Sequence, residues 1–123
     1  MTADNYTRAF TVDHVLDGDT LMAATVDLGY HEQTIGITYR VARVNSPEMG
    51  TKTGPTRVAA NAAKAYTEQW LTEHAAHGGL FAESTQTDDW RRYIAEITCG
   101  TGGHNLSDDL LTSGNAVPYK RQG

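Results

Sequence analysis

The 123-residue chain has few cysteines, few basic residues and no long hydrophobic run. Its single cysteine, Cys99, has no partner for an internal disulfide, so the sequence does not require an oxidising compartment. No stretch of about 18 apolar residues is present, which excludes an ordinary transmembrane helix. Residues 1–5 have neither the basic nor the apolar region of a signal peptide. We therefore expect a cytoplasmic protein that does not associate with membranes.

Positive charge is scarce, because 10 Lys and Arg residues face 15 Asp and Glu residues and the net charge is −5. Proteins that hold long nucleic acids tightly usually have a basic surface. A few arginines gathered with a metal ion at one site are still enough to act on a phosphodiester. The charge therefore favours transient contact with a nucleic acid over a stable architectural role.

Length and composition predict a single domain spanning residues 1–123. Alternating and β-branched segments predict five strands: Phe10–Leu16, Thr20–Leu28, Thr34–Val44, Leu80–Glu83 and Tyr93–Thr98. The first three are joined by short turns, a pattern typical of a meander that opens a small barrel.

Two helices are predicted between and after these strands. Pro55 suits the first turn of a long helix that ends near Gly78-Gly79. Residues with a 3.6-residue period predict its buried face: Val58, Ala59, Ala62, Ala63, Tyr66 and Trp70. Asn105 is expected to cap a short helix that runs through Leu111 and is closed by Gly114.

Charged residues that suit phosphate chemistry occur in three segments. The first is the turn Asp17-Gly18-Asp19-Thr20, and the second is the strand and turn Tyr39–Glu48. The third is Asp88-Asp89-Trp90-Arg91-Arg92-Tyr93. Together they would place two carboxylates and two guanidinium groups around one phosphate.

Each candidate also has a plainer interpretation. Asp17 and Asp19 suit a turn for backbone reasons alone. Arg40 and Arg43 are an odd number of positions apart, so they point to opposite faces of a regular strand and one of them is a surface charge. A solvated Glu48 after a proline usually has no function. Taken one by one, these residues do not establish a site.

The order of the motifs, however, resembles the staphylococcal nuclease (thermonuclease) family of calcium-dependent phosphodiesterases. The resemblance covers about residues 12–119 and rests on Asp-Gly-Asp-Thr, Arg-x4-Asn-Ser-Pro-Glu, a long helix, Asp-x-Trp-x-Arg and Asn-Leu-x4-Leu-x2-Gly in that order. It implies an α+β fold, mainly β, in which a five-stranded OB-fold Greek-key barrel carries one long and one short helix.

The resemblance also implies the catalytic residues. Arg40 and Arg92 match the two family arginines that bind the phosphate and stabilise the charge growing on it. Glu48 matches the general base that activates or positions the attacking water. Asp17 is expected only to hold its turn, and Asp89 stands where a basic residue often binds a terminal phosphate.

The cofactor implied by the resemblance is Ca²⁺, with Asp19, Asn45 and Ser46 as its ligands. Asn45 replaces a family aspartate; its neutral amide oxygen still ligates calcium but attracts it less. Ser46 replaces a threonine and keeps both a carbonyl and a hydroxyl. Tyr119 and Arg91 are the expected substrate-binding residues.

Histidine offers a different route to a metal site. His74 and His77 are one helical turn apart near a helix end, a spacing at which two side chains can share a metal. No third ligand is evident in the sequence, and helix C-termini favour histidine anyway. His14, His31 and His104 are isolated in the sequence, so we interpret all five as having no metal role.

We therefore expect a calcium-dependent nuclease that hydrolyses DNA or RNA to 3′-phosphate products, preferring single-stranded or frayed substrate. The alternative is a non-catalytic OB-fold module with a degenerate nuclease site that binds single-stranded nucleic acid or a protein partner. Arg40, Glu48 and Arg92 occur together, and this favours the enzyme, because a pure binding module has no need of that set.

Overall fold

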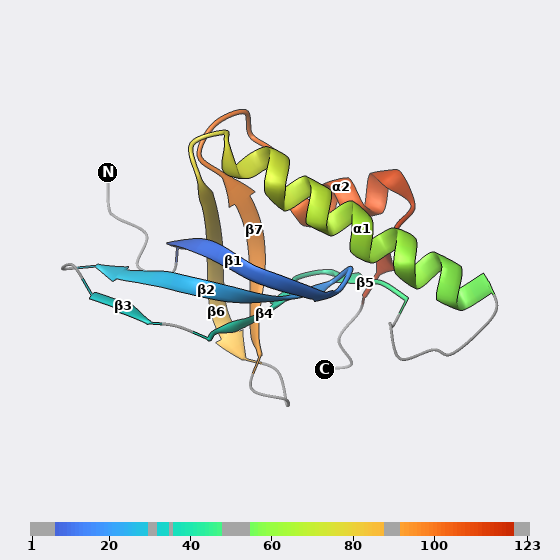
Figure 1. Cartoon of the computed structure of the whole chain (residues 1–123), viewed down its shortest axis with the longest axis horizontal. Coiled ribbons are helices and arrows are strands. Elements are labelled where there is room, and N and C mark those ends of the chain that lie inside the picture. Colours follow the sequence, from blue (N-terminus) through green and yellow to red (C-terminus); the bar gives the residue numbers. More distant parts are fainter. Residues whose placement is uncertain (1–6, 30–31, 35, 48–54, 88–91, 120–123) are drawn as a thin grey trace.

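The computed structural model describes residues 7–29, 32–34, 36–47, 55–87 and 92–119. Its elements are β1 (Thr7–Asp17), β2 (Thr20–Gly29), β3 (Glu32–Thr34), β4 (Thr38–Val41), β5 (Val44–Asn45), α1 (Pro55–Ala75), β6 (Leu80–Thr87), β7 (Tyr93–Cys99), α2 (Leu106–Ser113) and β8 (Val117–Pro118). The fold is mixed α+β and consists mostly of strands, which confirms the predicted class (Figure 1). Neither helix is long and apolar enough to cross a membrane within these ranges.

The main sheet has the strand order β1-β6-β7-β4-β2-β3, and β1 also pairs with β2. β1 places Phe10 opposite Val26 of β2 and opposite Leu80 of β6, in both cases antiparallel. β4 and β7 are parallel, with Arg40 opposite Ile94. The pairings therefore lead from β1 through four further strands and back to β1. A second, two-stranded sheet joins β5 to β8.

The predicted third strand, Thr34–Val44, is wrong as a single element. The structure has β3, β4 and β5 over this stretch, and a turn at Ala42-Arg43 separates β4 from β5. Gly36 has φ +72° and Arg43 has φ +68°, and the chain cannot stay extended at either residue because this left-handed conformation bends it. In the sequence only Gly36 indicates such a bend, because glycine adopts a positive φ easily and arginine rarely does. β8 has no counterpart in the five predicted strands.

The long helix buries a face that differs in part from the predicted one. The buried side chains of α1 are Ala60, Ala63, Thr67, Trp70 and Leu71. Ala63 and Trp70 agree with the prediction, and Tyr66 is half-buried. The prediction is wrong at three exposed positions: Val58, Ala59 and Ala62. Val58 alone keeps 69% of its surface exposed.

Close packing against the β1–β2 turn explains which face is buried. A Cβ on Gly18 would lie 2.8 Å from the Cβ of Ala63, so helix and turn are already in contact. Thr67 donates a 2.6 Å hydrogen bond to the carbonyl of Gly18 and is fully buried. Small and hydrogen-bonding residues suit this contact better than bulky apolar ones, because the two backbones lie so close.

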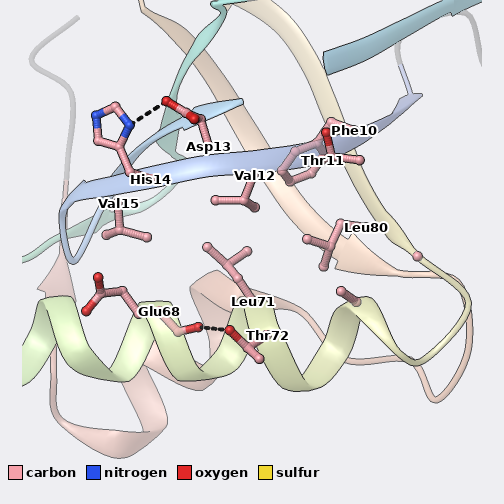
Figure 2. Close-up of a pocket in the computed structure, with 12 residues that line it drawn as sticks. Phe10, Thr11, Val12, Asp13, His14, Val15, Glu68, Leu71, Thr72 and Leu80 are labelled. Atoms are coloured by element: carbon pink, nitrogen blue, oxygen red, sulfur yellow. Dashed lines mark hydrogen bonds and ion pairs between the residues drawn. The ribbon is translucent and has the colours of Figure 1, made fainter. Parts of the chain in front are cut away.

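The other half of α1 packs on β1 and borders an apolar cleft of about 540 Å³ (Figure 2). Val12 and Val15 point toward the helix, where Leu71 faces them. Asp13 and His14 lie on the opposite side of the strand, with their side chains 2.8 Å apart. No residue that lines this cleft belongs to the predicted nuclease site.

Candidate functional site

Asp19 lies in the turn between β1 and β2 and is 6% exposed. Its Oδ1 accepts a hydrogen bond of 2.9 Å from the Thr20 hydroxyl, and its Oδ2 accepts one of 2.8 Å from the backbone N–H of Ser46. The same Oδ2 lies 3.3 Å from Nη1 of Arg40. A buried carboxylate needs such partners, because burial removes the water that would otherwise stabilise its charge.

Arg40 connects three of the predicted site residues. Its Nη1 pairs with Asp19, and its Nη2 donates to Oδ1 of Asn45 at 3.4 Å. The guanidinium carbon lies 5.5 Å from the centre of the Tyr119 ring. Its Nη1 also donates to the carbonyl of Val41 at 2.9 Å. Only 12% of the side chain is exposed, so the guanidinium is held in one orientation by fixed partners.

Ser46 completes this group of side chains. Its Oγ is buried and has no hydrogen-bond partner among the described residues. A Cβ on Gly18 would come within 3.0 Å of that oxygen, so the turn approaches Ser46 as closely as it approaches the helix. A buried hydroxyl without a partner is uncommon, and among the described residues this oxygen alone combines full burial with the lack of one.

The structure thus brings together five of the eight predicted site residues: Asp19, Arg40, Asn45, Ser46 and Tyr119. Arg92 precedes β7, whose first residue, Tyr93, pairs with Tyr39 of β4 beside Arg40. The predicted general base Glu48 and the predicted substrate contact Arg91 lie outside the described residues.

A cleft of about 500 Å³ opens beside the site. Asn45 and Ser46 line one side of it, and Ala59 and Ala62 of α1 line another. Val117 of β8, which is 60% exposed, lies at the same cleft. Two of the three helix positions that the sequence wrongly assigned to the core, Ala59 and Ala62, therefore border this opening next to the predicted metal ligands.

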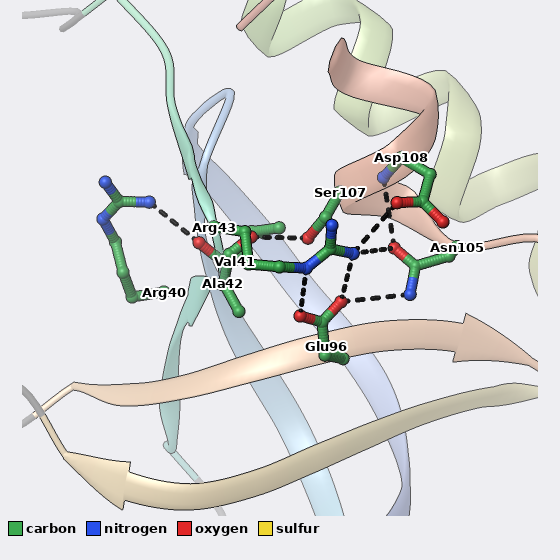
Figure 3. A network of polar contacts seen from close by, with 8 residues as sticks. All are labelled: Arg40, Val41, Ala42, Arg43, Glu96, Asn105, Ser107 and Asp108. Carbon is green, nitrogen blue, oxygen red and sulfur yellow. Dashed lines mark hydrogen bonds and ion pairs between the residues drawn. The ribbon is translucent and has the colours of Figure 1, made fainter. Parts of the chain in front are cut away.

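Arg43 points away from Arg40 (Figure 3). Strand alternation is not the cause, because Arg43 lies in the turn after β4 with φ +68°. It is not simply solvated, because it forms two hydrogen bonds to Glu96, of 2.6 and 2.8 Å, and one of 3.0 Å to Asp108. Asn105 donates to Glu96 at 3.0 Å as well. Burial alone would raise the pKa of Glu96, but the hydrogen bonds from Arg43 and Asn105 outweigh burial and lower that pKa.

This network fixes the short helix against the turn before β5. Ser107 is fully buried and donates a 2.6 Å hydrogen bond to the carbonyl of Ala42. Arg43 also accepts through its backbone carbonyl from the N–H of Tyr119, at 2.9 Å. Arg43 is therefore fixed by hydrogen bonds of both its side chain and its backbone. Its backbone bond also fixes Tyr119 next to the turn between β4 and β5. No pattern in the sequence indicated this network.

No family model and no curated protein matches this chain. The resemblance to the staphylococcal nuclease family accordingly remains a prediction, which depends on the order of the motifs.

The oxygen donors at the site suit calcium in kind. Asp19 offers a carboxylate, Asn45 an amide oxygen and Ser46 a hydroxyl, and calcium prefers such hard oxygen ligands in a flexible arrangement. Their charge is less favourable, because the positive Arg40 offsets the negative Asp19. Among the described residues the set therefore matches calcium by ligand type, while the charges of Asp19 and Arg40 offset each other.

Proposed function

We propose that this protein is a calcium-dependent nuclease that hydrolyses DNA or RNA phosphodiesters and leaves 3′-phosphate products. The observation that carries the proposal is the guanidinium of Arg40, held between Asp19 and Asn45 and under the ring of Tyr119. These four residues come from the β1–β2 turn, β4, β5 and the chain after β8, so tertiary folding alone unites them.

We also propose that the main sheet forms the five-stranded OB-type barrel expected of such a nuclease. In support, the pairings run from β1 through β6, β7, β4 and β2 back to β1. In a closed sheet of this kind the turn after β1 and the end of β4 lie at the same rim, and this is where Asp19 and Arg40 meet.

Arg40 binds the scissile phosphate in this proposal. Its planar fork matches two phosphate oxygens, and its pairing with Asp19 orients that fork before substrate arrives. Arg92 supplies a second positive charge, which stabilises the negative charge that grows on the phosphate oxygens as water attacks. Glu48 accepts the proton of that water. Calcium, when bound by Asp19, Asn45 and Ser46, adds positive charge beside the phosphate.

Tyr119 suits contact with a base. Its side chain is 52% exposed, and its ring already lies 5.5 Å from the Arg40 guanidinium. A base stacked on this tyrosine would place the adjoining phosphate close to Arg40. Because a base must leave the duplex to stack in this way, single-stranded or frayed substrate is favoured, and the net charge of −5 favours brief contact.

The test is digestion of a single-stranded DNA oligonucleotide with calcium, with magnesium and with chelator. We expect cleavage with calcium alone, because flexible oxygen ligation suits magnesium poorly. Arg40→Lys should lower kcat by about tenfold or more, since a point charge does not replace the planar fork. Arg43→Lys makes the same chemical change at a side chain that points away from the site, and because a lysine can still pair with Glu96 it should leave kcat within about twofold. If the folded protein does not cleave the oligonucleotide in calcium, the proposal of a nuclease is refuted.

The balanced charge of the Asp19–Arg40 pair favours one other function, a non-catalytic module that binds single-stranded nucleic acid or a protein partner. In such a module Arg40 would bind phosphate without any metal. Binding of a labelled oligonucleotide in chelator, lost in Tyr119→Ala and unaccompanied by cleavage in calcium, would identify this module instead of the enzyme.

A further inference from the structure

Three side chains of types that often bind metals lie close together where the end of α1 faces the start of α2. His74, His104 and Asp109 each offer a ligand atom, and these atoms all lie within 4.8 Å of one another. His104 is thus not isolated, although nothing in the sequence links it to His74. None of the three is a predicted residue of the nuclease site.

His74 is oriented as a metal ligand would be. Its Nδ1 lies 2.8 Å from the carbonyl oxygen of Trp70, which can only accept, so Nδ1 carries the proton. Nε2 of the neutral ring then has its lone pair available. The ring also stacks on Trp70 with centroids 4.1 Å apart. Metal-bound histidines typically donate their second N–H to a carbonyl in this way, which fixes the ring and its tautomer.

Asp109 is held by the same tryptophan. Its Oδ2 accepts a 2.7 Å hydrogen bond from Nε1 of Trp70, which is 3% exposed. Trp70 therefore orients both a histidine and a carboxylate from one buried position. The second oxygen of Asp109 is the atom that an ion would use, while the first keeps its hydrogen bond.

His104 supplies the movable third ligand. Its ring lies edge-on to His74 with centroids 4.7 Å apart, and the side chain is exposed. The loop that carries it is attached to the end of α1, because Thr101 donates to the carbonyl of His77 at 2.8 Å and Gly100 donates to that of Gly79 at 3.0 Å. The backbone is therefore positioned while the imidazole remains open to solvent and to an arriving ion.

We propose that His74, His104 and Asp109 bind a divalent transition metal, with zinc as the best match. Two imidazoles and one carboxylate are typical zinc ligands, whereas calcium and magnesium prefer oxygen alone. Ligand atoms around tetrahedral zinc lie roughly 3.4 Å apart, so the group must close by up to about 1.4 Å, which rotation of the exposed His104 permits. A water completes the fourth position. The ion would join α1 to α2 and to the loop before it.

The test is titration of the full-length protein with zinc chloride in calcium-free buffer, followed by calorimetry and by thermal melting. We expect one zinc per chain and a melting temperature that rises with zinc concentration, because zinc binds the folded state. His104→Ala should weaken zinc binding by about tenfold or more. Asp109→Asn should do the same, although its amide oxygen can still accept from Trp70 and preserve the fold.

Two histidines serve as controls. His14→Ala removes an exposed histidine on β1 and should leave zinc binding unchanged. His77→Ala removes the histidine nearest to the cluster, whose ring lies 5.6 Å from that of His74. Loss of binding in His77→Ala with none in His104→Ala would overturn the ligand set. Equal losses in His14→Ala and His104→Ala, or no zinc binding by the parent protein, would overturn the site itself.

Discussion

Replacement of Asn45 by Asp tests the proposed calcium site with a single added charge. Asn45 accepts from Nη2 of Arg40 at 3.4 Å, and Asp19 lies 3.3 Å from Nη1 of the same guanidinium. A carboxylate at position 45 would therefore gain attraction to Arg40 and repulsion from Asp19 at once. Asn45 is exposed, so we expect water to screen both effects and stability without calcium to change by less than about 0.5 kcal/mol.

Calcium should respond much more strongly than stability does. The ion is attracted by both carboxylates, and a few-fold to tenfold gain in affinity corresponds to about 1 kcal/mol in a partly solvated site. At saturating calcium this would raise the melting temperature of Asn45→Asp by roughly 4 °C more than that of the parent protein. Thermal melts across a calcium titration measure both quantities on the same samples.

Asn61→Asp is the matched control, because it makes the same chemical change on the exposed surface of α1. We expect its calcium response to equal that of the parent protein. If Asn45→Asp also responds like the parent, Asn45 does not face a calcium site, and the metal-free binding module becomes the better interpretation. A gain in both variants would show only general attraction of calcium to an acidic protein.

Two further predictions concern the surroundings of the site. Gly18→Ala should lower the free energy of unfolding by about 1–3 kcal/mol in denaturant titrations, because the new Cβ would lie 2.8 Å from Ala63 and 3.0 Å from Ser46. A loss below about 0.5 kcal/mol would mean that turn and helix are not in close contact. Glu96 has a pKa lowered below 4.5, so its stabilising contribution is complete above pH 4.5 and is lost as the pH falls through the lowered value. The parent protein should therefore lose more stability than Glu96→Gln between pH 6 and pH 3, and parallel losses would remove the proposed role of the Arg43–Glu96 pair.

Several local features were predictable from the residues alone. Asn105 caps α2 by accepting from the N–H of Asp108, and Gly114 closes it with φ +78°, as the sequence indicates. The start of β2 alternates as expected, with Leu21 and Ala23 buried and Met22 half-buried, but a register shift against β1 then moves burial to Val26 of the opposite set. Each of these depends on residues a few positions apart, where backbone geometry limits the choices.

The family motifs predicted a site whose assembly was beyond local rules. They named Asp19, Arg40, Asn45 and Ser46, and the structure places these residues in contact. The bond from Ser46 N–H to Asp19 spans 27 positions in the sequence. No periodicity encodes such a contact, because it depends on the strand pairing that brings two turns to one place.

The chain's local chemistry thus determines where the two helices and most of the strands occur, and how α2 is capped. Tertiary packing alone decides which face of α1 is buried, because the choice depends on the approach of Gly18 to Ala63. It also decides that Arg43 breaks a strand to reach Glu96, and that His104 meets His74. Such contacts join residues far apart in sequence, and their free energy appears only after the strands have paired and the helices have docked.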